Sequence, residues 1–361
     1  MTRRVVRTIR VRSTVVARRA GRGVAQGVEA ARLARVRLGR PIGAVFAFHG
    51  VVERVEDRDV QLNHVELGAF ENALAAIRAR FEIVSLSDLA AALADGRSTQ
   101  RPLAVLSFDD GYVSTLELVH PLLSREGLPH AVFVCPGLID AGARLPSFVA
   151  QAAVLFARVE SAALPHAGTL RLDAERSRAE EAWRVVDLVK RLPQDEVYEL
   201  VEACRALLTG DEWREVDRRF TSEALLDWDG VRSLAAEGVT IGSHTLDHAS
   251  MHSVQSSDVL RAQTIGARLR IEHELGSPCR VFCYPYGRYV NLSPEAVAEV
   301  AAAGYGVALT LETGTVRIGM SPLLLPRVYV GPKFDPVRLD RLLAPVRDRR
   351  FVRASRGLRL V

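Results

Sequence analysis

Long apolar runs are missing from this chain of 361 residues, although 48% of its residues are hydrophobic. No segment reaches the ~20 apolar residues that a membrane span needs, and the N-terminus has no continuous apolar stretch typical of a secretory signal. The four cysteines show no paired spacing, which favours reduced core thiols over disulfides or a zinc knuckle. The composition therefore predicts a cytoplasmic globular protein with one large core or two modest ones.

Acidic residues are almost absent from residues 1–40, which hold twelve arginines against one glutamate, whereas the whole chain has a net charge of +5. Val5, Ile9 and Val16 share one helical face between these arginines, which suits peripheral binding to an anionic membrane surface at the inner membrane face. A solvated flexible tail is an equal alternative. No aromatic residue lies between the arginines to stack on bases, so no nucleic-acid partner is expected.

Beyond Pro41 the pattern changes to short apolar runs that alternate with helix-like segments, which predicts a parallel α/β sheet, open or closed into a barrel. The strand-like runs are residues 43–50, 82–86, 103–108, 130–137, 238–244, 280–287 and 306–311. Residues 146–221 interrupt the alternation, are charged and helical in character, and lack strand-like runs. The predicted organisation is a basic arm (1–40), a main domain (41–335) with a helical insertion over one end (about 146–221), and a basic tail (336–361).

Polar side chains follow the predicted strands at the ends where such folds place their chemistry. Two adjacent carboxylates at the end of a buried strand repel each other and resist desolvation, so a cation or strong donors must compensate them. The residues in these positions are His49, Asp109, Asp110, His244, His248 and the run Tyr284-Pro285-Tyr286.

His244 and His248 are four residues apart, which puts two imidazoles on the same side of a turn. Together with one carboxylate oxygen they would form an open metal site of two histidines and one aspartate. Such a site lowers the pKa of a bound water from ~15.7 toward ~7 and polarises a carbonyl. One of the two aspartates would then bind the metal, and its neighbour would be free to accept a proton.

Three segments, "SFDDGY", "GSHTLDH" and "FCYPYG", resemble the first, second and third motifs of the polysaccharide deacetylases, the NodB-homology group or carbohydrate esterase family 4. The resemblance covers about residues 45–330. It implies a distorted (β/α)7-type barrel and the hydrolysis of N-acetyl groups from an amino sugar with release of acetate.

The resemblance also implies roles for individual residues. Asp109 would be the general base, and the backbone N–H of Tyr286, which follows Pro285, would help to hold the oxyanion. The implied ligands of zinc or a similar divalent ion are Asp110, His244 and His248.

The sequence departs from the family pattern in two places. The late histidine that protonates the leaving amine is missing, and "LLLPRVYVG" offers Arg327 there. His49 resembles the early histidine of a branch in which this last motif has moved to the front of the chain. The arginine ahead of the third-motif proline is also absent, since Phe282, Cys283 and Tyr284 stand there, and either Arg327 or Arg280 could replace it.

Two other kinds of function stay open at this stage. A metal-dependent amidase or deformylase that acts on a small or lipid-linked amide would need the same residues, and a weakly active carbohydrate-binding relative would explain the missing acid. Because no secretory signal is evident, the expected substrate is a lipid-linked or nascent exopolysaccharide precursor rather than finished cell wall.

Overall fold

The computed structural model describes residues 41–96 and 99–339. The predicted basic arm (1–40) and the tail from residue 340 onward lie outside these described residues. None of the helices in the described part of the chain combines the length and the apolar character that crossing a membrane requires.

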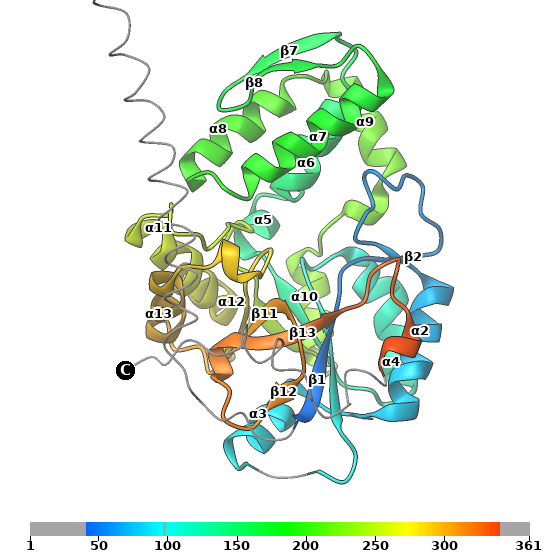
Figure 1. The fold of residues 1–361 in the computed structure, drawn as a ribbon, viewed down its shortest axis with the longest axis vertical. Helices are drawn as coiled ribbons and strands as arrows, with labels where there is room; N and C mark the ends of the chain where they lie inside the picture. Colours follow the sequence, from blue (N-terminus) through cyan, green and yellow to red (C-terminus); the bar gives the residue numbers. More distant parts are fainter. Residues whose placement is uncertain (1–40, 97–98, 340–361) are drawn as a thin grey trace, which may run out of the picture. The chain divides into compact units, whose positions relative to one another are not determined.

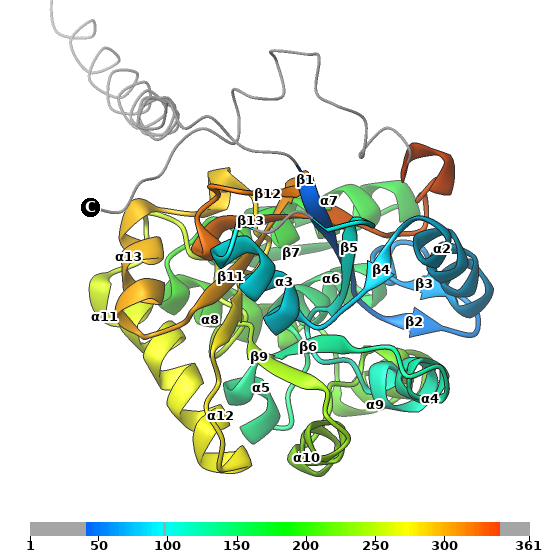
Figure 2. The same ribbon diagram turned by 90° about the horizontal axis from the view of Figure 1, so that it is seen from below.

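Seven parallel strands form a closed barrel. Each strand pairs with the next in chain order, and the last pairs with the first. The predicted (β/α)7-type barrel is therefore confirmed, and Figure 2 shows helices surrounding the ring. The strands are β1 (Pro41–Phe48), β5 (Leu103–Phe108), β6 (His130–Val134), β9 (Thr240–Ser243), β10 (Val281–Cys283), β11 (Val307–Thr313) and β13 (Leu325–Tyr329).

Four further short strands extend or flank the ring. In the barrel sheet, β4 (Glu82–Ile83) lies parallel to β5 and β12 (Val316–Arg317) lies antiparallel to β1. Outside it, β2 (Val51–Val52) pairs with β3 (Val65–Glu66).

Barrel strands are buried on both faces, which explains why they read as continuous apolar runs rather than alternating ones. Four of the helices around the barrel begin at residues that the sequence marks as caps. Ser85 forms a capping box with Asp88, and Ser293 caps a helix that has Pro294 in its first turn. The helices around the barrel are α2 (Leu67–Arg80), α3 (Leu86–Ala94), α4 (His120–Arg125), α5 (Pro136–Asp140), α10 (Trp228–Ala236), α11 (Ser257–Arg261), α12 (Ala267–Leu275) and α13 (Pro294–Ala302).

The insertion between β6 and β9 forms a separate layer, and Figure 1 shows it above the end of the barrel from which α5 starts. We call residues 146–221 the cap. Its helices pack around their own apolar cluster, which includes Val149, Leu170, Leu200 and Phe220. The helices are α6 (Pro146–Phe156), α7 (Glu175–Val189), α8 (Gln194–Arg205) and α9 (Gly210–Arg219).

One expectation for the cap is wrong: the segment is not free of strands. An antiparallel hairpin, β7 (Ser161–Leu164) and β8 (Gly168–Arg171), joins α6 to α7. Its strands are only four residues long and mostly exposed, so they lack the buried apolar run by which the barrel strands were identified.

Candidate active site

The residues singled out at strand ends meet at one rim of the barrel. β1, β5, β9 and β10 end at Phe48, Phe108, Ser243 and Cys283, so the residue after each strand lies at the same edge. The register aligns these ends, since Phe48 lies opposite Phe108 and Phe282 opposite Ser243. His49, Asp109, His244 and Tyr284 are the residues that follow the four strands.

Asp109 is held by a buried guanidinium. Arg327 on β13 donates two hydrogen bonds of 2.7 Å to Asp109, one to each carboxylate oxygen. The same guanidinium donates to Ser107 Oγ at 3.2 Å and to the carbonyl of Thr310 at 2.8 Å. Burial alone would raise the pKa of Asp109, but the charge and hydrogen bonds of Arg327 outweigh it and lower the pKa to about 2.

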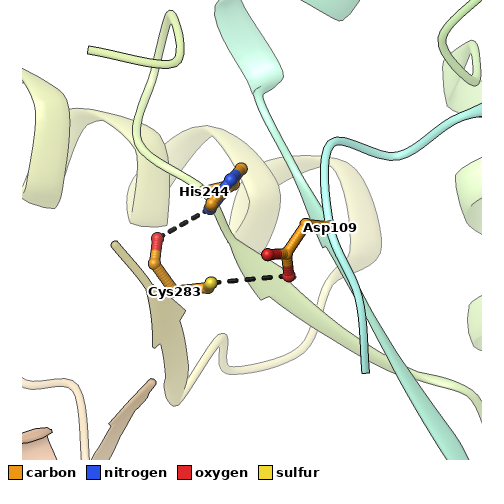
Figure 3. Close-up of side chains that lie close together, drawn as sticks. All are labelled: Asp109, His244 and Cys283. Carbon is orange, nitrogen blue, oxygen red and sulfur yellow. Dashed lines mark hydrogen bonds between the residues drawn. The ribbon is translucent and has the colours of Figure 1, made fainter. Parts of the chain in front are cut away.

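Of the two arginines that the sequence offered as partners for this carboxylate, the structure brings Arg327 to it. Arg280 is exposed and precedes β10, at the opposite end of the strand from the site. Cys283 occupies the third-motif position next to Asp109, with Sγ 3.5 Å from Asp109 Oδ1 (Figure 3). The guanidinium that contacts Asp109 therefore comes from β13, and the residue of β10 beside Asp109 is a cysteine instead of an arginine.

Asp110 faces the two histidines. Its Oδ1 lies 3.4 Å from His244 Nε2 and 3.1 Å from His248 Nε2, and all three side chains are buried. Burial would raise the pKa of Asp110, yet the two imidazoles lower it, so the carboxylate stays ionised.

A divalent cation fits this trio. Figure 3 shows His244 Nδ1 engaged with the carbonyl of Cys283, at 2.8 Å. This contact leaves Nε2 directed toward Asp110. Asp110 Oδ1, which the Nε2 atoms of both histidines face, is buried without a hydrogen-bond partner among the described residues. One carboxylate oxygen and two imidazole nitrogens are a donor set suited to zinc and related ions.

A second trio, Asp109, His244 and Cys283, also brings its ligand atoms close together. It fits a cation poorly, because Arg327 already neutralises the carboxylate of Asp109. The Asp110 trio is therefore the better candidate metal centre.

The backbone around the site is strained. Among the described residues, five that are not glycine have positive φ, and four of them, Asp110 (72°), Thr245 (63°), His248 (58°) and Tyr286 (59°), lie in the three motifs. Such conformations cost of order 1–3 kcal/mol each and persist only where surrounding contacts enforce them. They point to a functional site independently of the side-chain chemistry.

Gln263 enforces the turn between the two histidines, and the sequence analysis missed it. Its side-chain oxygen accepts from the N–H groups of Leu246 and Asp247, and its Nε2 donates to Asp247 Oδ2 at 2.9 Å. Tyr198 of the cap donates to the same carboxylate oxygen at 2.8 Å. A glutamine inside a helical pattern gives no motif signal, so only the fold reveals this contact.

His49 and Tyr286 complete the rim. His49 Nε2 lies 4.0 Å from Asp109 Oδ2, and its Nδ1 is buried without a hydrogen-bond partner among the described residues. The Tyr286 ring lies edge-on to His248 at 4.8 Å, and no backbone acceptor among the described residues takes the Tyr286 N–H. Pro285 is buried beside it.

A buried pair behind the site also escaped the sequence analysis. His64 Nε2 lies 3.1 Å from Glu223 Oε1, and the His64 ring packs on Tyr112, two residues after Asp110. Burial lowers the pKa of His64 to about 4 and raises that of Glu223 to about 8. Both side chains are therefore mainly uncharged at neutral pH, which avoids two isolated buried charges.

The family model described as polysaccharide deacetylase matches residues 96–308 of the chain. No curated protein matches the chain by sequence. Solved structures do match it in fold. The Streptococcus pyogenes deacetylase PplD in complex with acetate is 15% identical, with a TM-score of 0.55 over 84% of this chain and 100% of that one.

Two further solved structures have similar scores. IcaB from Ammonifex degensii is 16% identical, with a TM-score of 0.56 over 86% of this chain and 100% of that one. A de-N-acetylase from Aggregatibacter actinomycetemcomitans is 15% identical, with a TM-score of 0.54 over 83% of this chain and 99% of that one. At these identities the likeness shows a shared fold.

Replacing Arg327 with Met should leave Asp109 as a buried charge without a partner. The expected loss in the free energy of unfolding at pH 7 is about 3–5 kcal/mol, measured by urea denaturation. The exposed Arg288→Met is the matched control and should change it by less than about 0.5 kcal/mol. Equal stability of the two variants would contradict the partnership.

The pH dependence of this variant should have the opposite sign to that of the native protein. In the native protein the pKa of Asp109 lies below its ordinary 3.8, so the stability it contributes is complete above that value and is lost as pH falls toward about 2. Without Arg327, burial raises the pKa, so the variant should recover stability relative to the native protein as pH falls below 7.

Proposed function

The chain belongs to the polysaccharide deacetylase family, and from this premise we propose that it is a metal-dependent hydrolase that removes N-acetyl groups from an amino-sugar polysaccharide or its lipid-linked precursor. The fold shared with proteins named deacetylase and de-N-acetylase supports an N-acetylated substrate. The products would be acetate and a free amine on the sugar.

The observation that carries this proposal is the division of two adjacent carboxylates between different partners. Asp109 is paired with Arg327, whereas Asp110 faces two imidazoles. Neighbouring carboxylates in such different surroundings take different roles, one in proton transfer and one in binding a cation.

In the proposed site Asp110, His244 and His248 would hold the cation, with zinc as the expected ion. When bound, the ion supplies a Lewis acid that polarises the amide carbonyl and acidifies water. The choice of zinc follows from these three ligand types alone.

Asp109 accepts the proton of the attacking water in this mechanism. Arg327 fixes both carboxylate oxygens, so the base has one orientation. Because Arg327 stabilises the ionised form, Asp109 is a carboxylate at neutral pH, which is the form that a general base requires, and it releases an accepted proton again readily. The N–H of Tyr286 donates to the oxygen that becomes negatively charged as the carbonyl carbon turns tetrahedral.

His49 supplies the proton that the departing amine requires. An amide anion is too basic to leave at neutral pH, so an acid that titrates near neutrality is needed. His49 lies at the rim beside Asp109, with Nε2 directed toward the carboxylate. Arg327 stands in the segment where the family's late histidine is missing. It binds Asp109, and a guanidinium does not release a proton at neutral pH, so Arg327 cannot be the acid.

The place of the reaction remains a prediction. A substrate met at the inner membrane face depends on the basic arm of residues 1–40, which lies outside the described residues.

Metal removal tests the proposed reaction. The purified protein should release acetate from N-acetylglucosamine oligomers, lose this activity on dialysis against a chelator, and regain it with one equivalent of zinc. His244→Ala should keep neither zinc nor activity, whereas His166→Ala, in the cap, should keep both. Acetate release that survives complete metal removal would contradict the metal dependence.

The two aspartates should separate by metal content. Asp109→Asn should keep bound metal but lose roughly 10²–10⁴-fold in turnover, the usual contribution of a general base. Asp110→Asn should also lower metal affinity, because it replaces a charged ligand with a neutral amide. Atomic absorption on both purified variants measures this, and identical metal contents would refute the division of roles.

His49→Ala should keep zinc and fold but lose roughly 10²–10⁴-fold in turnover on the amide. The loss should be smaller on 4-nitrophenyl acetate, whose leaving group needs no proton. His166→Ala is again the matched control. Equal losses on amide and ester would remove His49 from the role of acid.

A further inference from the structure

Lysine is rare in this protein: the chain has 46 arginines and only two lysines, Lys190 and Lys333. Lys190 caps the C-terminus of α7, in the cap. Lys333 is exposed, four residues after β13. Since arginine supplies nearly all the cations of this chain, a half-buried lysine is unusual and calls for a physical reason.

Lys190 is half-buried, and no carboxylate oxygen of the described residues lies within ion-pair distance of its ammonium. The nearest charged neighbours on its own segment are already matched, because Arg191 is paired with Asp187 at 2.9 Å. Burial lowers the pKa of Lys190. The charge of Asp187 offsets part of this effect, and the charge of Arg191 adds to it. A bound anion would offset the rest of the free energy that partial burial of the cation costs.

The Lys190 ammonium is near the candidate active site. Its Nζ lies 5.5 Å from the centre of the Tyr286 ring, and the same ring lies 4.8 Å from the His248 ring. A hydrogen bond fixes the cap beside the candidate active site: Tyr198 of α8 donates to Asp247, which lies between His244 and His248. A single tyrosine ring therefore separates Lys190 from the proposed metal ligands.

We propose that Lys190 binds an anionic group, a carboxylate or a phosphate, carried by the glycan next to the N-acetylated sugar. The inference rests on the proposed function and narrows its substrate class to acidic glycans. A lysine suits this task because its compact ammonium acts as a point charge with three rotatable donors. The cation–π contact holds the ammonium against the Tyr286 ring, and no acceptor among the described residues takes a hydrogen bond from it.

A purely structural role makes a different prediction. A lysine at the C-terminus of a helix interacts favourably with the last carbonyls, and its contact with Tyr286 adds to packing. Substitution would then weaken the protein, or its turnover of every substrate, to the same degree. Binding of an anion affects only substrates that carry one.

The test compares three probes: neutral N-acetylglucosamine oligomers, hyaluronan oligosaccharides that carry carboxylates, and N-acetylglucosamine oligomers with a terminal phosphate. Lys190→Gln should raise KM about 10- to 100-fold for the preferred acidic probe, as expected for a charged hydrogen bond, with little change in kcat. KM for the neutral oligomers should not change. Lys190→Arg should restore part of the affinity, and Lys333→Gln, the matched control, should behave like the native protein.

Binding measured by calorimetry separates this inference from the proposed function. If the native protein binds an acidic probe more tightly than the neutral one, and Lys190→Gln removes the difference, the inference holds even when no acetate is released. If the native protein deacetylates the neutral oligomers with equal or better affinity, or if Lys190→Gln affects all three probes equally, the inference is overturned and the proposed function stands.

Discussion

The buried pair of Arg327 and Asp109 is the interaction around which the site is arranged. Its partners come from β13 and from the end of β5, on either side of β1 in the closed barrel. Arg327 also donates to Ser107 and to the carbonyl of Thr310, so one guanidinium joins three neighbouring regions of the wall. A buried charge is tolerated when it is paired and hydrogen-bonded, and the two hydrogen bonds from Arg327 fix the Asp109 carboxylate in place.

The adjacent Asp110 must then turn away from the guanidinium. Its left-handed φ of 72° directs it toward His244 and His248 instead of continuing the strand. The backbone strain at His248 and Tyr286 follows the same logic, because each of these residues leaves a strand end or a turn in a direction that regular structure does not provide. Gln263 and Asp247 hold the histidine turn from behind, so the strain is balanced by specific hydrogen bonds.

The sequence predicted the barrel and the residues at its rim because parallel strands read as apolar runs and their ends carry the polar motifs. His49, Asp109, Asp110, His244 and His248 follow strands that were identified in this way. The sequence could not decide whether Arg280 or Arg327 is the partner of Asp109, since that choice depends on which end of a strand faces the site. The hairpin β7–β8 and the contacts of Gln263 were missed for a related reason: exposed short strands and a helix-borne amide leave no periodic or motif signal.

The closure of the barrel between its first and last strands has a consequence for how the protein is made. β1 leaves the ribosome first among the described strands, yet one of its edges has to wait for β13, more than 270 residues later. Until then Asp109 lacks its counter-charge and an edge of the sheet stays open to wrong pairing. Contacts so distant in sequence form slowly, so the rim is complete only after β13 has been synthesised, and the nascent chain is exposed to aggregation before that point.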